Sequence, residues 1–323
     1  MRKIPRCIYR RCLTGHWRGE YSAVRTVQNL SRHLMNSMYR VCSIHDTQTL
    51  VPHREHIRKL FLSCFGKSFD PALWAWAYCD NPCGPAYVHL AYAGEELVAH
   101  YAMIPLRYIG AGCRVVAALS MTTMVHPSHR KSGLFRDLAE ATYQQGSADG
   151  VSAVVGFPNS NSIPGFRKRL NWKINEQLGI ASLPVTSQTT SNIPTVESIS
   201  AADFRTAFRS PTKAMTLDLS DPAILEWRLG KPGARYQLLR APDTLFIVKP
   251  FGNTLDVVYH SRLDARDIEM LSDYASRHGF SALTVFKKIG EQSSQMTPYR
   301  FGFRIFRSKK LEFEPQLILS DVF

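Results

Sequence analysis

The residues most suggestive of chemistry lie in the stretch "HPSHRKSGLFRDLAE", positions 126–140. It places Arg130 and Lys131 just before Gly133, and it holds no acidic residue before Asp137. The pattern predicts a tight turn after a strand and a helix that begins behind Gly133. The first amides of a helix lack intrahelical acceptors, and the helix dipole makes this end positive. We therefore expect an anion-binding turn, in which glycine lets phosphate oxygens approach the main chain.

The turn has a simpler alternative explanation. A basic turn that is merely solvated has the same composition, so the pattern alone is weak. It is not a nucleotide P-loop, because the spacing GxxxxGK[ST] is absent. The elements that position the turn therefore decide between the two interpretations.

Periodicity from residue 39 onward predicts the element order βααβββαβαβ. A second short helix is expected behind Asp70 as its cap, with Pro71 in its first turn. The three strands over residues 86–127 are joined at "AGEE" and "GAG". The other elements are expected at 39–44, 53–65, 71–78, 134–145, 150–157, 163–170 and 171–183.

The chain partly repeats itself. "DPALWAWAY" (70–78) and "DPAILEWRL" (221–229) share Asp, Pro, Ala and Trp at the same relative positions, and an apolar hairpin follows both. Coincidence is the alternative, but tryptophan is rare, and we predict two related α/β domains. No glycine precedes the second copy's helix, "ARDIEMLSDYASRHG", so we expect a cofactor in the first domain only.

The domains are expected at 38–182 and 215–323, joined by a Ser/Thr-rich linker at 183–214. Residues 1–37 carry seven arginines, one lysine and one acid. This leader lacks periodicity, and we expect it to be disordered. Three interpretations stay open: an upstream start codon, a flexible tail, or an arm for nucleic acid or a membrane surface.

Composition excludes several classes of protein. With 45% hydrophobic and 20% charged residues the chain suits a globular protein, and its apolar runs are far shorter than the ~20 residues of a membrane span. Seven scattered cysteines without a CxxC pair predict no metal site and a cytoplasmic location. Half of the net charge of +14 lies in the leader, so we expect no nucleic-acid partner.

The turn in its context resembles the GNAT superfamily of acyl-CoA N-acyltransferases. The family signature, Arg/Gln-x-x-Gly-x-Gly/Ala, is matched by "RKSGLF" (130–135), with Phe135 departing from the small residue. "VSAVVGFPN" and "FRKRLNWK" resemble the family's fifth strand and the segment after it. The resemblance implies an α/β (α+β) fold of two tandem GNAT-like domains. Each would be a twisted, mixed, mostly antiparallel sheet flanked by helices.

The resemblance also implies a reaction. Acetyl-CoA (acyl-CoA) would donate its acetyl group directly to a primary amine, without a covalent enzyme intermediate. The aromatic helix, "GFPNSNS" and the second domain resemble two-domain proteins that modify amino sugars or other amines in bacterial polysaccharide and secondary-metabolite pathways. Main-chain N–H groups of Met124 and Val125 would stabilise the thioester oxyanion. The remaining implied cofactor-binding residues are His129, Arg130, Lys131, Ser132, Gly133 and Leu134.

The proton-transfer groups are less defined. Many family members use a tyrosine after the fifth strand, but none occurs between Tyr143 and Tyr236. His126 is a candidate base, and so is the C-terminal carboxylate of Phe323, because such a group acts in some tandem relatives. Asn159 would bind pantetheine or substrate, or simply cap the following helix.

The acceptor, a small-molecule amine, would lie beside the aromatic helix. Trp74 and Tyr78, four residues apart, would share a sugar-stacking face, with Asp80 and Asn81 nearby; Trp76 is expected in the core. Two other functions remain open, an aminoacyl-tRNA-dependent peptide ligase of related fold and a non-catalytic acyl-CoA-binding protein. The sequence gives no prediction of the oligomeric state.

Overall fold

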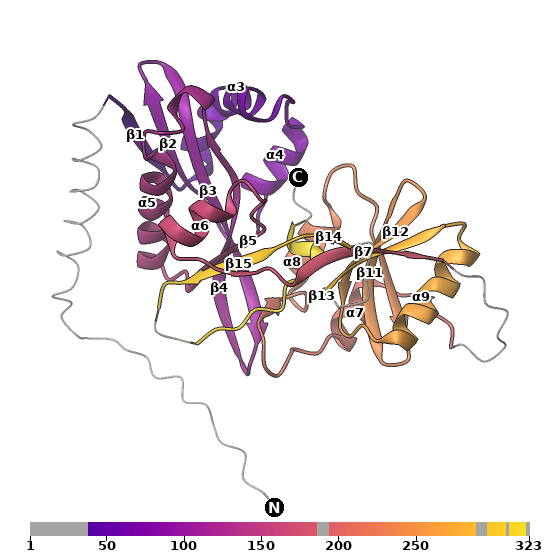
Figure 1. The fold of residues 1–323 in the computed structure, drawn as a ribbon. Coiled ribbons are helices and arrows are strands. Elements are labelled where there is room, and N and C mark those ends of the chain that lie inside the picture. The colour runs from indigo at the N-terminus through magenta and orange to yellow at the C-terminus, as the bar shows by residue number, and fades with distance from the viewer. Residues whose placement is uncertain (1–37, 186–193, 289–295, 308–309, 321–323) are drawn as a thin grey trace, which may run out of the picture.

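The computed structural model describes residues 38–185, 194–288, 296–307 and 310–320. It contains two β-sheets side by side, each flanked by helices (Figure 1), which confirms the predicted fold class. The leader 1–37 lies outside the described residues. Within the described ranges, no helix is long and apolar enough to cross a membrane.

The first sheet is built mainly from the N-terminal half of the chain. The pairs β1–β2, β2–β3 and β3–β4 are antiparallel, and β5 is parallel to β4. The register of β3 and β4 shifts between His100 and Ala102, so β4 carries a bulge. In spatial order the strands are β1 (Arg40–Ile44), β2 (Tyr87–Ala93), β3 (Glu96–Gly110), β4 (Cys113–Val125), β5 (Ala153–Gly156), β15 (Phe301–Ile305) and β6 (Lys173–Asn175), while β9 (Thr216–Leu217) pairs with β3.

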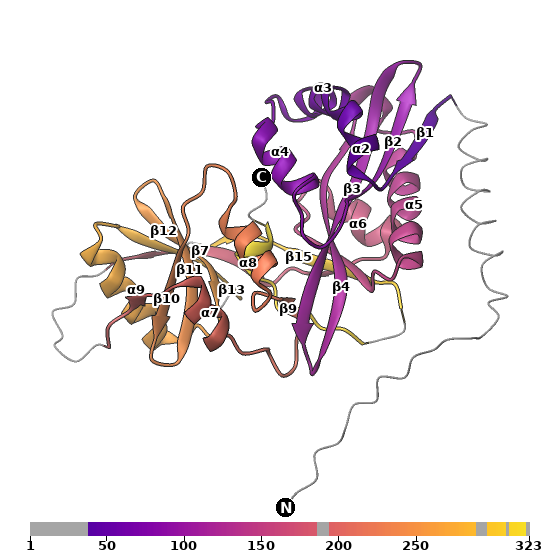
Figure 2. The same cartoon turned by 180° about the vertical axis from the view of Figure 1, so that it is seen from behind.

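Helices cover both faces of this sheet. α5 packs through Tyr143 on one face, and α4 packs through Trp74 on the other (Figures 1 and 2). α4 begins as predicted, because the Asp70 side chain accepts a hydrogen bond from Ala72 N and Pro71 occupies the first turn. The helices are α2 (Thr47–Leu50), η1 (Val51–His53), α3 (Arg54–Phe65), α4 (Pro71–Tyr78), η2 (Pro127–His129), α5 (Leu134–Ala148) and α6 (Ile163–Leu170).

The second sheet repeats this plan. Its fourth and fifth strands in spatial order, β12 and β13, are again parallel, and the register again shifts between β11 and β12. In spatial order the strands are β8 (Glu197–Ser198), β10 (Gln237–Ala241), β11 (Thr244–Phe251), β12 (Thr254–His260), β13 (Ala282–Lys288), β7 (Leu178–Pro184) and β14 (Met296–Pro298). Its helices are α7 (Ala201–Ala207), α8 (Pro222–Leu229) and α9 (Ala265–Arg277), and α10 (Leu317–Ser320) ends the described chain.

The two units exchange one strand each. β15 lies between β5 and β6 of the first sheet, and β7 lies between β13 and β14 of the second. We expected a single strand over 171–183, but it is divided into β6 and β7 at a turn where Asn175 accepts a hydrogen bond from Gln177 N. The expected linker 183–214 likewise contains β8 and α7. The boundary between the units is therefore not a single cut in the chain.

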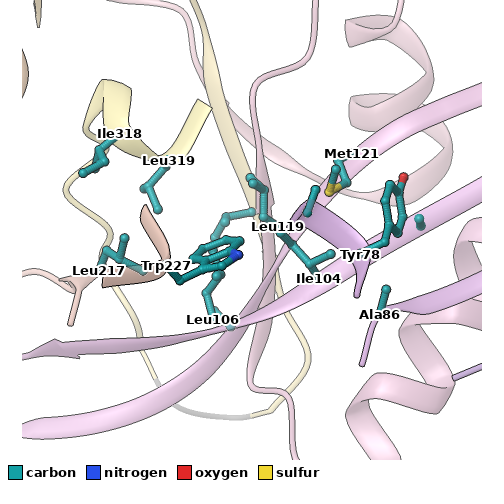
Figure 3. Close-up of a cluster of buried hydrophobic side chains, with 14 of the residues drawn as sticks. Tyr78, Ala86, Ile104, Leu106, Leu119, Met121, Leu217, Trp227, Ile318 and Leu319 are labelled. Carbon is teal, nitrogen blue, oxygen red and sulfur yellow. The ribbon is translucent and has the colours of Figure 1, made fainter. Parts of the chain in front are cut away.

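The two repeated tryptophans meet between the units. The rings of Trp76 and Trp227 stack with centroids 4.6 Å apart and an interplanar angle of 14°. Each indole N–H donates to the other residue's carbonyl, at 2.7 and 2.9 Å. Such reciprocity is what a local two-fold relation produces. Trp76 is buried, as expected, and Figure 3 shows Trp227 in the shared core with Leu106 and Leu319.

Candidate functional site

The turn that precedes α5 is held by local hydrogen bonds. His126 Nδ1 lies 2.9 Å from Ser128 Oγ, and Ser132 donates to the carbonyl of His129 through both its N–H and its hydroxyl. Gly133 is the N-cap of α5 with φ +89°, a left-handed conformation that strains any residue with a Cβ. The predicted glycine junction is therefore present, and its backbone requires glycine.

No side chain caps the N-terminus of α5, and Asp137 in its first turn is paired with Arg136. Gly133 supplies no side chain to cap this end, and the Leu134 N–H reaches only Ser132 Oγ, at 3.4 Å. The side chains of Arg130 and Lys131 are exposed and have no carboxylate partner among the described residues. Unpaired amides and two unpaired cations together make a site suited to an anion.

The equivalent helix of the second unit is closed. Asp264 accepts a hydrogen bond from Asp267 N, and the Asp267 carboxylate accepts one from Asp264 N. Asp267 is fully buried and also receives hydrogen bonds from Arg262. The carboxylates of this capping box occupy the place that an anion would need. The two helices therefore differ in whether their N-terminal amides are free to bind a phosphate: those of α9 are occupied by carboxylates, and those of α5 have no side-chain cap.

Phe135, which departs from the small residue of the family signature, does not fill the turn. Its ring packs edge-on against Phe166, with centroids 5.3 Å apart. A Cβ added to Gly165 would lie 3.0 Å from this ring. Gly165 in α6 therefore makes room for the aromatic ring, which joins α5 to α6.

Strands β4 and β5 separate beside the turn. They pair only over residues 117–119 and 153–155, although β4 continues to Val125. His126 N donates to Val98 O, and alternation along an antiparallel ladder then directs the Met124 amide to β3 and the Val125 amide away from it, towards the β5 side. Of the two amides that we expected to face a thioester, Val125 has the suitable direction and Met124 does not.

A buried histidine, which the sequence did not single out, supports the bulge in β4. Thr122 has φ +52°, and its carbonyl accepts a 2.7 Å hydrogen bond from His100 Nδ1. Burial lowers the pKa of His100 to about 4, so the ring is neutral with its proton on Nδ1. Nε2 is buried without a hydrogen-bond partner in the described part of the chain. A signal was available in the sequence, because a histidine interrupts the apolar β3.

The expected sugar-stacking face is not exposed. Trp74 and Tyr78 do share one face of α4 and stack with centroids 5.2 Å apart, but each is only 1% exposed. The residues of α4 are almost all apolar, so the helix is buried on several sides rather than one. Burial also raises the pKa of Tyr78. These rings belong to the core, and their assignment as a surface for substrate was wrong.

Asn81 has a structural role in the turn after α4. Its Nδ2 donates to Pro105 O at 2.8 Å and its Oδ1 accepts from Cys83 N at 3.0 Å, so both ends of the amide are engaged. The side chain is 7% exposed. Asp80 is exposed at the end of α4 and remains available to a ligand.

The other candidates lie around the ends of β4 and β5. The Asn159 side chain accepts hydrogen bonds from Asn161 N and Ser162 N, which agrees with the helix-capping alternative. His129 Nδ1 lies 2.8 Å from the Tyr39 hydroxyl. His126 is half-buried next to His129, with ring centroids 6.0 Å apart. Phe323 lies outside the described residues.

Strand exchange brings a tyrosine to the end of β5. Tyr299 precedes β15, and its ring stacks on Phe157, directly after β5, with centroids 5.3 Å apart. We found no tyrosine in the sequence near this strand, because the nearby segment comes from the far end of the chain. Only the exchanged position of β15 reveals it.

Comparison with known proteins relates the first unit to a protein family. Residues 53–175 match the model of the acetyltransferase (GNAT) domain family. This segment is therefore similar in sequence to GNAT acetyltransferase domains. The expected class of enzyme, a GNAT-type acyl-CoA N-acyltransferase, is confirmed at the level of this domain.

Solved structures extend the likeness of the fold to most of the chain. A probable N-acyltransferase from Enterococcus faecalis is 11% identical in sequence, with a TM-score of 0.61. The superposition covers 83% of this chain and 73% of the Enterococcus chain. A GCN5-related N-acetyltransferase from Kribbella flavida is 12% identical, with a TM-score of 0.60, and the match covers 83% of this chain and 71% of the Kribbella chain. A GCN5-related N-acetyltransferase from Anabaena variabilis is 14% identical, with a TM-score of 0.59, and the match covers 82% of this chain and 73% of the Anabaena chain. No curated protein sequence matches the chain.

Proposed function

We propose that this protein transfers an acetyl group from acetyl-CoA directly to a primary amine of a small molecule. The observation that carries the proposal is the contrast between the two helices. The N-terminus of α5 has no side-chain cap and is flanked by two cations without an ion pair in the described part of the chain, whereas the N-terminus of α9 is capped by its own carboxylates. The first unit would bind the cofactor and the second would not.

The residues of the turn fit a diphosphate. The amides of Lys131 and Gly133 would donate to its oxygens, and so would that of Leu134 in place of its long bond to Ser132. Arg130 and Lys131 would neutralise its charge. Acetyl-CoA supplies an activated acyl group whose leaving group is a thiolate. The Val125 N–H, directed away from β3, would stabilise negative charge on the thioester oxygen. The bulge at Thr122, which His100 holds, sets the direction of this part of β4.

Two protons must move in such a reaction. The attacking ammonium has to lose one, and His126 beside the turn is our candidate base. The carboxylate of Phe323 is the second candidate. Tyr299, stacked on Phe157, is our candidate for giving a proton to the leaving thiolate. Asn159 and Asp80 remain candidates for contacts with pantetheine and with the acceptor.

The acceptor class rests on the family resemblance. An amino sugar of a polysaccharide pathway is our proposal, but the aromatic surface that would have stacked on it is buried. A screen of amino sugars, amino acids and polyamines for CoA release would identify the acceptor.

Calorimetric titration with acetyl-CoA tests the cofactor site. We expect the double variant Arg130→Glu/Lys131→Glu to bind at least tenfold more weakly, because each lost charge-assisted hydrogen bond is worth about 1.5–3 kcal/mol. Arg266→Glu, an exposed arginine at the start of α9, is the matched control and should bind like the unchanged protein. Equal affinity in both variants, or no heat with the unchanged protein at millimolar ligand, would refute the proposal.

A further inference from the structure

The second unit contains a cavity of about 640 Å³ that the acyl-transfer proposal does not use. Its wall is formed by the β10–β11 hairpin, the end of β12, the segment after α7 and residues 314–316. Pockets of 300–1,000 Å³ are the usual size for small ligands. The turn that precedes α5 does not contribute to it.

Arg209 and Glu314, two groups of opposite charge, line this cavity, and neither forms an ion pair with another described residue. Arg209 Nη1 donates only to the carbonyls of Thr206 and Phe208, at 2.7 and 2.9 Å. The carboxylate of Glu314 is half-buried and has no hydrogen-bond or ion-pair partner within the described ranges, and burial raises its pKa. A charge kept from water without a counter-charge is costly, so the half-buried Glu314 favours a cationic group on a ligand. Arg209 is exposed, and its guanidinium is accessible to an anionic group.

The other arginines of the cavity are already paired. Arg240 forms a 2.5 Å ion pair with Glu197, and Arg262 forms one of 3.1 Å with Asp267. Arg209 is therefore the one arginine of this lining without an ion pair among the described residues. The acidic groups of the lining are Glu314 and the exposed Asp243 at the tip of the β10–β11 hairpin.

The wall also offers an uncharged hydrogen-bond acceptor. His260 Nδ1 is buried without a partner in the described structure, and burial lowers the pKa of this ring to about 4. The carbonyl of His260 accepts a 3.2 Å hydrogen bond from the buried Gln316. A donor group on a ligand could satisfy the Nδ1 lone pair.

The first unit has a cavity at the corresponding place. Ser261 N donates to Leu245 O at the end of β12, as His126 N donates to Val98 O at the end of β4. A cavity of about 330 Å³ lies there, lined by the β2–β3 hairpin, α3 and His126. The second unit thus combines a larger cavity with a closed helix N-terminus, an arrangement suited to binding a ligand without transferring a group to it.

We propose that the cavity of the second unit binds a small zwitterion, with an α-amino acid as the simplest case. The guanidinium of Arg209 would bind the carboxylate, and the carboxylate of Glu314 would bind the ammonium group. A ligand with one charge leaves the other protein group unpaired, so both charges are needed for tight binding.

Thermal-shift measurements with the twenty standard L-amino acids at 10 mM, without acetyl-CoA, select the probe. Calorimetry then compares the best amino acid with the amine that lacks its carboxylate and the acid that lacks its amino group. We expect the zwitterion to bind at least tenfold more tightly than either. No thermal shift with any amino acid, or equal binding of a singly charged analogue, would overturn the proposal.

Two variants test whether the amino acid binds between Arg209 and Glu314. Arg209→Gln and Glu314→Gln should each weaken binding of the amino acid at least tenfold, while the exposed controls Arg235→Gln and Glu269→Gln should not. Arg209 is exposed, so its variant stays informative even if Glu314→Gln does not fold. Acetyl-CoA affinity should be unchanged in all four, which separates this site from the cofactor site. Unchanged amino-acid affinity in Arg209→Gln would contradict the assignment.

Discussion

At the scale of single residues, the turn before α5 depends on Gly133. Its φ of +89° is in the left-handed region, and the nearest atom to an added Cβ is an Asp137 oxygen at 3.5 Å. Space is therefore available, and the constraint is on the backbone. From the sequence alone, Gly133→Glu would test only the charge of the site, but the structure shows that any side chain here also strains the main chain.

We therefore predict the effect of Gly133→Ala against a matched control. Gly150, at the other end of α5, has φ +100° and no atom within 4 Å of an added Cβ. Both alanine variants should lose about 1–2 kcal/mol of unfolding free energy, because both force a Cβ into a left-handed conformation. Only Gly133→Ala should also weaken acetyl-CoA binding in calorimetry. Equal affinities in the two variants would contradict the role of the turn.

A second prediction at this scale concerns the pH dependence of stability. Burial lowers the pKa of His100 from 6.5 to about 4, so protonation favours the unfolded chain. The contribution of His100 is complete above pH 6.5 and is lost as the pH falls towards 4. In urea unfolding near pH 5, His100→Gln should reduce the slope of stability against pH by about 1 kcal/mol per unit. The exposed control His45→Gln should leave it unchanged, and an unaltered slope in His100→Gln would show that the ring is not neutral in the fold.

At the scale of elements, Phe135 and Gly165 connect α5 to α6. Gly165→Leu should destabilise the protein by about 1–2 kcal/mol, because its side chain meets the Phe135 ring. In the Phe135→Ala background the same change should stabilise by about 1 kcal/mol, since it fills the vacated space and leucine is the better helix former. Chemical denaturation of the four proteins measures the coupling. Additive effects would mean that the two residues do not pack together.

Local patterns predicted the elements well and the buried surfaces poorly. The Asp70 cap, the end of α3 at residue 65 and the junction at Gly133 are encoded by neighbouring residues and were predicted from the sequence. Whether the Trp74 face is exposed depends on distant strands, and helical spacing cannot give it. Nor could periodicity show that residues 171–183 divide between two sheets. Tyr299 was missed for the same reason, since its neighbours are remote in sequence.

At the scale of the whole molecule, strand exchange joins the two units. β15 fills the gap between β5 and β6, and β7 fills that between β13 and β14. Each sheet is incomplete without a strand from the other half of the chain. The stacked pair Trp76 and Trp227 adds a shared core at the local two-fold axis.

This arrangement predicts that neither half folds alone. A fragment of residues 38–185 lacks β15 and would expose the unpaired edges of β5 and β6. Circular dichroism and amide NMR spectra should show it unfolded or aggregated, and addition of the fragment 186–323 should restore the native spectrum. The intact chain should unfold in one transition. A fragment 38–185 that folds and unfolds cooperatively by itself would show that the exchange is not required.

The central claim is that the turn at residues 130–134 holds the diphosphate of acetyl-CoA, and a crystal structure of the complex tests it most directly. We predict diphosphate oxygens within hydrogen-bond distance of the amides of this turn, with Arg130 or Lys131 beside them, and no cofactor at α9. Cofactor density at the N-terminus of α9, or anywhere away from the gap between β4 and β5, would contradict the account.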